Sequence, residues 1–290
     1  MRWVWVALCC LFAAGGARAF APRAVSWSDH GNAFLAVLGD NRLHVARVAA
    51  EGIIDLVSLP ATGVTALAVA PRHSTPTVLA AYGTVLLQMN FSHQNWEVLG
   101  YAPATIREIH PAPDDTSRAL LLTGDPEHPA AGDGAVWLAD WNGLTGISRV
   151  PGVKDDAHPW QLWWMRAQNQ QCLACATDKT SPAVTAKLNG MYVFSWNGHE
   201  ARPRWLGTRL SRPYLDATYA DLHHDGQWRM AAVEVAEDGR RSLAVYRAVG
   251  FGFEGEWRSD PLPGLERVAA FTTLVLGWGV TPPAPRAVGN

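Results

Sequence analysis

Most of the chain alternates short apolar segments with polar turns. Segments of four to eight residues rich in Val, Leu, Ala, Trp and Tyr are separated by clusters of Gly, Pro, Asn and Asp. No stretch keeps the hydrophobic period of an amphipathic helix over three turns, and the pattern is typical of β-strands joined by turns. We therefore predict an all-β protein.

One layout recurs five times: an extended run, a short polar turn and a second run that often carries tryptophan. The turns are centred about 40 to 55 residues apart, near Ala49, Ser92, Asn142, Asn197 and Gly250, which is the period of four-stranded propeller blades. An apolar strand, a polar loop and another apolar strand precede each turn, so every unit supplies two hairpins. Because one blade cannot bury both of its faces alone, the units must stack around an axis.

The predicted fold is a β-propeller of five to six four-stranded blades over residues 20–280. Residues 264–280 resemble the first hairpin of a sixth unit. Residues 281–290 are Pro-rich and are expected to form a flexible C-terminal tail. A β-sandwich or two small all-β domains are the alternatives, but neither explains the fivefold recurrence.

The first residues predict export. Arg2, the apolar run from Trp3 to Ala14 and the small residues ending at Ala19 are typical of a secretory signal peptide, and the run is too short to span a bilayer. We expect residues 1–19 to be removed, which leaves no stable transmembrane segment. The expected location is secreted or extracytoplasmic, in the periplasm or at the cell surface.

Charge argues against nucleic acid as a partner. Removal of residues 1–19 takes away Arg2 and Arg18 and no acid, so 22 basic and 26 acidic residues remain, with a formal net charge of −4. No block of Lys or Arg stands out that would follow a phosphate backbone.

The predicted mature chain keeps two cysteines, Cys172 and Cys175, in QQCLACATD. A redox pair or half of a zinc site are the functional interpretations. No second CxxC or HxxxH accompanies them, and a strand would place the two sulfurs on opposite faces. We predict that both are residues of a β-strand.

An acidic loop stands out in YADLHHDGQWRM, residues 219–230, with Asp221, His223, Asp225 and Gly226 in order. Together with FSWNG at 194–198 and GFGFEGEW at 250–257, it makes the stretch 158–260 similar to secreted bacterial FG-GAP or VCBS-type repeat proteins, relatives of the integrin α-chain propeller. In those repeats a DxDxDGxxD/E loop joins the first two strands of a blade and binds calcium. The resemblance implies a propeller and makes Asp221 and Asp225 candidate metal ligands.

The loop departs from that pattern at two positions. His223 replaces the second acid, and Arg229 stands where the closing carboxylate would be. Calcium prefers six to eight oxygen ligands, and a guanidinium repels a dication. We therefore predict a degenerate loop and no cofactor, calcium being the one ion that the resemblance suggests. Our hypothesis is that the Arg229 guanidinium pairs with Asp221 or Asp225 in place of the ion.

Catalytic candidates are weaker. His223 and His224 are residue types for a general base or metal ligand, but we expect them to face solvent. Asp133, Asp155 and Asp156 are candidate acids for a glycosidase, which needs two carboxylates across a sugar ring. The chain has no GxSxG, HExxH or phosphate-binding glycine loop, so we assign no catalytic residue.

Tryptophan is the remaining candidate for recognition. Trp160, Trp163 and Trp164 in PWQLWW lie on both faces of one predicted strand, so we expect one of them to be exposed and to bind a sugar or a protein. Tryptophans also recur near the second hairpin of four units, and these are expected to fill the contacts between blades: Trp96, Trp141, Trp196 and Trp257.

These features predict a non-catalytic propeller that serves as a binding or scaffold module at the cell envelope, with a protein or a glycan as its partner. Loops from every blade gather on one face of a propeller, so binding there needs no single strong motif. The alternative is a carbohydrate-active hydrolase with acids on the central face. Calcium-dependent adhesion is a third hypothesis, which Arg229 weakens.

Overall fold

The computed structural model describes residues 24–29, 32–39, 41–49, 52–70, 77–90, 93, 95–113, 115, 117–125, 133–141, 146–153, 157–167, 170–177, 190–223, 225–250, 252–265, 267–271 and 274–278. These residues form β-strands and turns, without an α-helix. The predicted signal peptide (1–19) and C-terminal tail (281–290) lie outside the described residues and stay predictions.

Five four-stranded antiparallel sheets, blades 1 to 5, follow one another along the chain. Blade 1 contains β1 (Ala24–Asp29), β2 (Asn32–Gly39), β3 (Arg42–Ala49) and β4 (Gly52–Pro60), and blade 2 contains β5 (Val64–Ala70), β6 (Thr77–Tyr82), β7 (Val85–Asn90) and β8 (Asn95–Tyr101). Blade 3 contains β9 (Ile106–Pro111), β10 (Arg118–Thr123), β11 (Ala135–Asp140) and β12 (Gly146–Arg149). Blade 4 contains β13 (Pro159–Ala167), β14 (Gln170–Thr177), β15 (Gly190–Trp196) and β16 (Ala201–Arg209), and blade 5 contains β17 (Tyr214–Ala220), β18 (Arg229–Val235), β19 (Arg241–Val249) and β20 (Gly252–Arg258).

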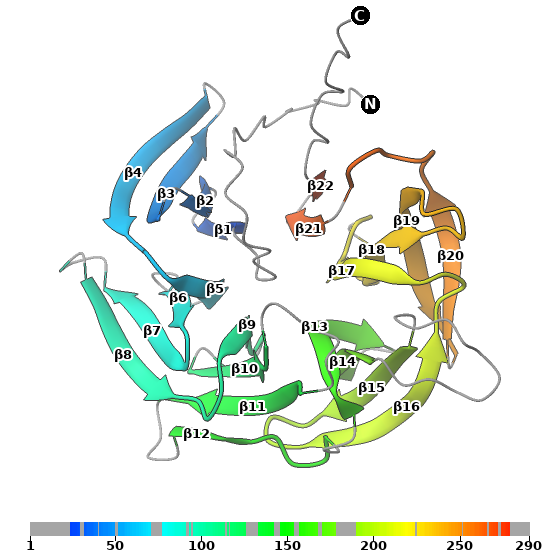
Figure 1. Ribbon diagram of the computed structural model, residues 1–290, viewed down its shortest axis with the longest axis horizontal. Helices are drawn as coiled ribbons and strands as arrows, with labels where there is room; N and C mark the ends of the chain where they lie inside the picture. Colours follow the sequence, from blue (N-terminus) through cyan, green and yellow to red (C-terminus); the bar gives the residue numbers. More distant parts are fainter. Residues whose placement is uncertain are drawn as a thin grey trace, which may run out of the picture.

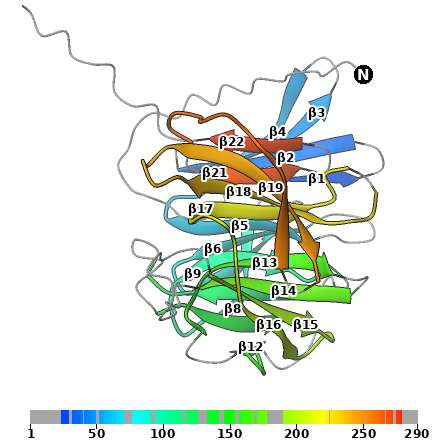
Figure 2. The ribbon, with the colours of Figure 1, turned by 90° about the vertical axis from the view of Figure 1, so that its right-hand side faces the viewer.

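The blades stand around an axis with their first strands innermost (Figure 1). Along the ring β1 contacts β5, β5 contacts β9, β9 contacts β13 and β13 contacts β17. A C-terminal hairpin, β21 (Arg267–Phe271) and β22 (Leu274–Trp278), contacts both β17 and β1. Figure 2, turned by 90°, shows this hairpin at the level of β1 along the axis.

This arrangement confirms the all-β propeller with five four-stranded blades. Every predicted turn-centred segment is the outer hairpin of a blade, and every apolar pair before it is the inner hairpin. The predicted additional hairpin within 264–280 is β21–β22. The local pattern therefore placed the hairpins correctly because turn residues mark each reversal of the chain.

Apolar cores lie between neighbouring blades, so inner strands are buried on both faces. On β14, Cys172 and Ala174 belong to the core between blades 4 and 5, whereas Leu173 and Cys175 belong to the core between blades 3 and 4. The two cysteines are buried free thiols on opposite faces of the strand, as predicted. Burial raises the pKa of both thiols, which disfavours the reactive thiolate.

The recurring tryptophans fill these interblade contacts at three of four positions. Trp196 is buried between blades 3 and 4, and Trp96 and Trp141 pack against the cores next to blade 2. The same prediction is wrong for Trp257, which is 54% exposed. Trp257 lies on β20, the outermost strand of blade 5, and β21 packs against the inner strands β17 and β18 instead.

Four inner strands begin with a β-bulge at the second residue, where the register with the next strand shifts. The unpaired residues are Thr65, Arg107, Trp160 and Leu215. A bulge bends a strand and re-aims its side chains. Thr65 Oγ1 donates to the Ile106 carbonyl of blade 3 at 2.9 Å, and buried Arg107 donates from Nη2 to the Trp160 carbonyl of blade 4 at 2.8 Å.

The residue after the bulge makes the next set of interblade hydrogen bonds. Glu108 Oε2 accepts from the backbone N–H of Leu162 at 3.0 Å. Gln161 Nε2 donates to Asp216 Oδ1 at 2.6 Å. Asp216 Oδ2 in turn accepts from the backbone N–H of Val268 at 2.8 Å, which ties blade 5 to the C-terminal hairpin. The inner strands are therefore joined from β5 to β21 by specific polar bonds as well as by apolar packing.

Blades 3 and 4 approach each other closely at Gly134, and substitution of this glycine tests the contact. A Cβ added there would collide with the carbonyl oxygen of Pro159, the first residue of β13, and backbone cannot rotate away as a side chain can. We expect Gly134→Ala to reduce the free energy of unfolding by about 1–3 kcal/mol, as overpacking does. Thermal and urea unfolding followed by tryptophan fluorescence measure the change.

Gly252→Ala is the matched control, because Gly252 also lacks a positive φ and an added Cβ there meets nothing within 4 Å. Equal melting temperatures for the two variants would contradict the proposed close approach of blades 3 and 4.

Candidate functional site

The acidic loop joins β17 and β18, the first two strands of blade 5, as the sequence predicted. Asp221 shapes the turn, because its Oδ1 accepts from the backbone N–H of Asp225 at 3.1 Å and its Oδ2 from that of Gly226 at 2.8 Å. Gly226 has a φ of 77°, in the left-handed region that favours glycine. Asp225 Oδ1 accepts from the backbone N–H of Gln227 at 2.9 Å. Both carboxylates thus hold their own backbone in a tight turn.

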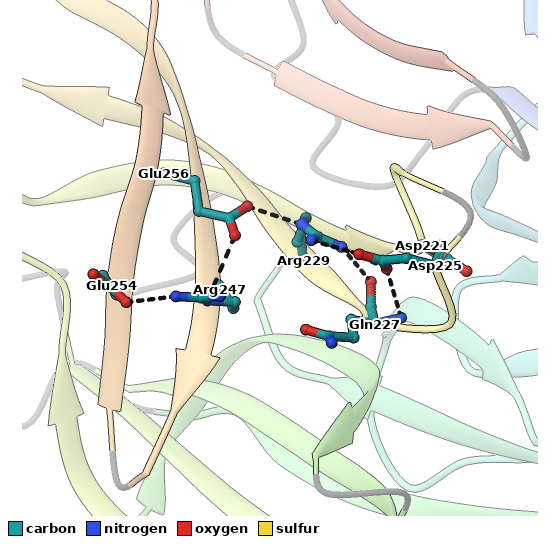
Figure 3. A network of polar contacts seen from close by, with 7 residues as sticks. All are labelled: Asp221, Asp225, Gln227, Arg229, Arg247, Glu254 and Glu256. Atoms are coloured by element: carbon teal, nitrogen blue, oxygen red, sulfur yellow. Dashed lines mark hydrogen bonds and ion pairs between the residues drawn. The ribbon is translucent and has the colours of Figure 1, made fainter.

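Arg229, the first residue of β18, lies across this loop (Figure 3). Its Nη1 donates to Asp225 Oδ1 and its Nη2 to Asp225 Oδ2, both at 2.8 Å, a two-point guanidinium–carboxylate pair. Nη1 also donates to the carbonyl of Gln227 at 2.9 Å. Arg229 is 6% exposed. The hypothesis of an Arg229–aspartate pair is confirmed, with Asp225 as the partner.

The outer hairpin of blade 5 extends this polar cluster. Arg229 Nε donates to Glu256 Oε2 at 2.8 Å, and Glu256 Oε1 lies 3.5 Å from Arg247 Nε. Arg247 Nη2 donates to Glu254 Oε2 at 2.9 Å. Glu256 reaches both arginines because it is the unpaired residue of a bulge in β20. Acidic and basic side chains therefore alternate from the loop to the outer edge of the blade (Figure 3).

The ion pair sets the protonation of both groups. Hydrogen bonds from the Arg229 side chain, followed by the backbone N–H of Gln227, hold the pKa of Asp225 well below its usual range. The Asp225 carboxylate raises the pKa of Arg229. At neutral pH the loop therefore carries a permanent internal cation.

This donor set does not fit calcium. Asp225 and the Gln227 carbonyl already accept from Arg229, and a dication beside them would face the positive guanidinium. Among the described residues no group of three or more His, Cys, Asp or Glu side chains is placed to hold a metal ion. His223 is exposed, as expected, whereas His224 lies outside the described residues.

Of the candidate catalytic acids, Asp133 lies in the described part of the chain. Asp133 accepts from the backbone N–H of Asp125 at 2.6 Å. Asp155 and Asp156 lie outside the described residues. The buried acids of the innermost strands are Glu108, which bonds blade 4, and Asp216, which bonds the C-terminal hairpin, as described above. Buried Glu234 of β18 pairs with Arg258 of β20 at 2.6 Å.

The tryptophans of PWQLWW are all buried, so the prediction of an exposed ring is wrong. Trp160, Trp163 and Trp164 are 8%, 5% and 9% exposed. The first two fill the core between blades 4 and 5, and Trp164 fills the core between blades 3 and 4. Their strand, β13, is innermost and is covered on both faces. Trp163 Nε1 donates to the carbonyl of Ala217 at 2.6 Å, which adds another bond between blades.

A surface hollow lies between blades 4 and 5, beside the acidic loop. This blade 4–5 hollow has a volume of about 260 Å³ and is lined by Arg166, Ala167, Trp205, Gly226, Gln227, Trp228, Arg247, Ala248 and Gly250. Its arginines and tryptophans come from β13, β16, β19 and the β17–β18 loop. These residues are far apart in the chain and share no local motif, so the hollow was not predicted from the sequence.

Comparisons with known proteins support the fold. No protein-family model and no curated protein sequence matches the chain. Among solved structures, the chain is similar to YjhT, with a TM-score of 0.51 and 10% sequence identity over 81% of this chain and 83% of that one. It is also similar to a chain of apo ctPRC2 in an autoinhibited state, with a TM-score of 0.51 and 12% identity over 83% of this chain and 52% of that one. The chain thus spans about half the length of the ctPRC2 chain, and likeness at this identity shows a β-propeller fold.

Replacement of the internal cation should create a response to calcium. We expect neither EDTA nor added calcium to shift the melting temperature of the unmodified protein, because Arg229 occupies the loop oxygens. Arg229→Glu removes that cation and adds a carboxylate near Asp225 and Glu256, so millimolar calcium should raise the melting temperature of this variant by several degrees. Arg240→Glu, on the β18–β19 turn, is the control. A calcium-dependent rise of several degrees in the unmodified protein would contradict the interpretation.

Acid should remove the contribution of the Asp225–Arg229 pair. The folded-state pKa of Asp225 lies below 3.8, the ordinary pKa of an aspartate, so its ionised form stabilises the fold above pH 3.8, and this stabilisation is lost progressively as the pH falls further. The melting temperature of Asp225→Asn should therefore lie below that of the unmodified protein at pH 7 and approach it at pH 2–3. A difference of the same size at both pH values would show that the charge of Asp225 has no part in it.

Proposed function

We propose that this protein is an exported, non-catalytic propeller that acts as a binding or scaffold module at the cell envelope, with a protein or a glycan as its partner. The observation that carries the proposal is the use of the described inner-strand acids. Glu108 and Asp216 are buried and accept backbone hydrogen bonds from blade 4 and from the C-terminal hairpin, respectively. Carboxylates that hold blades together are poorly placed to protonate or attack a substrate.

The acidic loop supports an origin among FG-GAP or VCBS-type repeats. It lies between the first two strands of a blade, where those repeats carry their calcium loop, and Asp221 and Asp225 keep the turn. In this proposal Arg229 has replaced the ion, so the module works without calcium.

The sequence pattern of residues 1–19 supports export of the module. No helix of the described residues is long and apolar enough to cross a membrane. We propose that the folded propeller is delivered outside the cytoplasm and that its loops meet the partner there.

A carbohydrate-active hydrolase is the competing function, and its candidate acids can be tested directly. Purified protein should show saturable binding to isolated envelopes of the source cell, competed by excess unlabelled protein, and no turnover of a chromogenic glycoside panel. The non-catalytic assignment would be overturned by glycoside turnover that is abolished in Asp133→Asn, Asp155→Asn or Asp156→Asn. Absence of saturable envelope binding would overturn the binding assignment.

A further inference from the structure

The blade 4–5 hollow combines positive charge with aromatic surface. The residues that line it include two arginines and two tryptophans, and none of them is acidic. Guanidinium groups pair with carboxylates through two parallel hydrogen bonds, and indoles offer flat apolar faces. This composition suits a ligand that carries an anionic group on a ring.

Arg166 supplies the cation that is available for a ligand. It is exposed near the end of β13 and forms no ion pair with any residue that the structure describes. Arg247 differs, because Glu254 and Glu256 pair with its guanidinium and hold it in place. The hollow therefore contains one fixed and one uncommitted arginine.

The aromatic wall is held in position by its neighbours. The indole of Trp205 lies under the Arg204 guanidinium, 5.3 Å from its ring centre, and makes an edge contact with Phe253 at 6.4 Å. Arg204 sits there because it is a bulge residue of β16. Trp228, from the acidic loop, is half-buried and leaves part of its ring accessible. Trp205 itself is 5% exposed and belongs to the core between blades 4 and 5, so Trp228 is the indole that a ligand ring would meet.

The acidic loop itself builds one side of the hollow. Arg229 bonds Asp225 and the Gln227 carbonyl, which fixes the backbone from Gly226 to Trp228, and its bond to Glu256 connects this backbone to Arg247. The internal ion pair thus orders the loop and a guanidinium of the hollow together (Figure 3).

We propose that the blade 4–5 hollow binds a carboxylate-bearing sugar ring, a hexuronate unit of an acidic polysaccharide. The volume of about 260 Å³ lies just below the range of pockets for drug-sized ligands, so it suits a single ring. The side-chain amide of Gln227 and the backbone carbonyls of Gly226 and Gly250 can bond the hydroxyl groups of a sugar, and an aromatic acid has no such hydroxyl groups. This inference rests on the proposed binding function and names its ligand class.

Galacturonate and digalacturonate are the probes, and galactose is the neutral match. Titration followed by tryptophan fluorescence and calorimetry should give saturable binding of the two uronates and none of galactose at equal concentration. Arg166→Gln should weaken uronate binding at least tenfold with an unchanged melting temperature, because a hydrogen-bonded charge pair is lost. Arg240→Gln, an exposed arginine paired with Asp238 on the β18–β19 turn, should bind as the unmodified protein does.

Three results would overturn the inference: equal binding of galactose, equal binding of benzoate, or unchanged uronate binding in Arg166→Gln. Trp228→Leu provides a second test, since loss of the stacking face should abolish the fluorescence change and weaken binding. Envelope binding that persists without uronate binding refutes this ligand class and leaves the proposed function standing. Loss of both refutes both.

Discussion

The propeller depends on polar side chains that leave one inner strand and bond the backbone of the next blade. Glu108, Gln161 and Asp216 hold equivalent places on β9, β13 and β17, each directly after a bulge. Apolar packing between blades is non-directional, whereas these bonds fix how one blade is placed against its neighbour. Once buried, such groups are costly to leave unpaired, so a shifted blade loses several hydrogen bonds together.

β-Bulges are the second feature that organises the structure. Each bulge changes the direction of a side chain that the regular in-and-out alternation of a strand would point elsewhere. In the inner strands they direct Thr65 and Arg107 toward the next blade. In the outer strands of blades 4 and 5 they place Arg204 over Trp205 and Glu256 between two arginines. β-Bulges therefore contribute both to the hydrogen bonds between blades near the axis and to the surface hollow at the rim.

Arg229 changes what an acidic loop can do. A bound ion can leave or exchange, but a guanidinium on β18 is covalently attached and stays protonated, so the turn is held without an external cofactor. The arginine also reaches Glu256, which an ion inside the loop would not bond in this way. The loop is consequently bonded to the outer hairpin of its blade. Ligand binding in the neighbouring hollow would therefore depend on residues of both blade 4 and blade 5.

The amino-acid sequence by itself determined the hairpins, their fivefold repetition and the pairing of Arg229 with an aspartate of its loop, because alternation, turn residues and short separations along the chain are local properties. The structure decided that this aspartate is Asp225. It also placed Cys172 and Cys175 on opposite faces of one strand. Only the tertiary structure decided which rings are covered. Trp160 is buried on an innermost strand and Trp257 is exposed on an outermost one, the reverse of what their sequence positions predicted. The hollow likewise exists only after two blades meet, since burial and pocket formation depend on contacts between residues far apart in the chain.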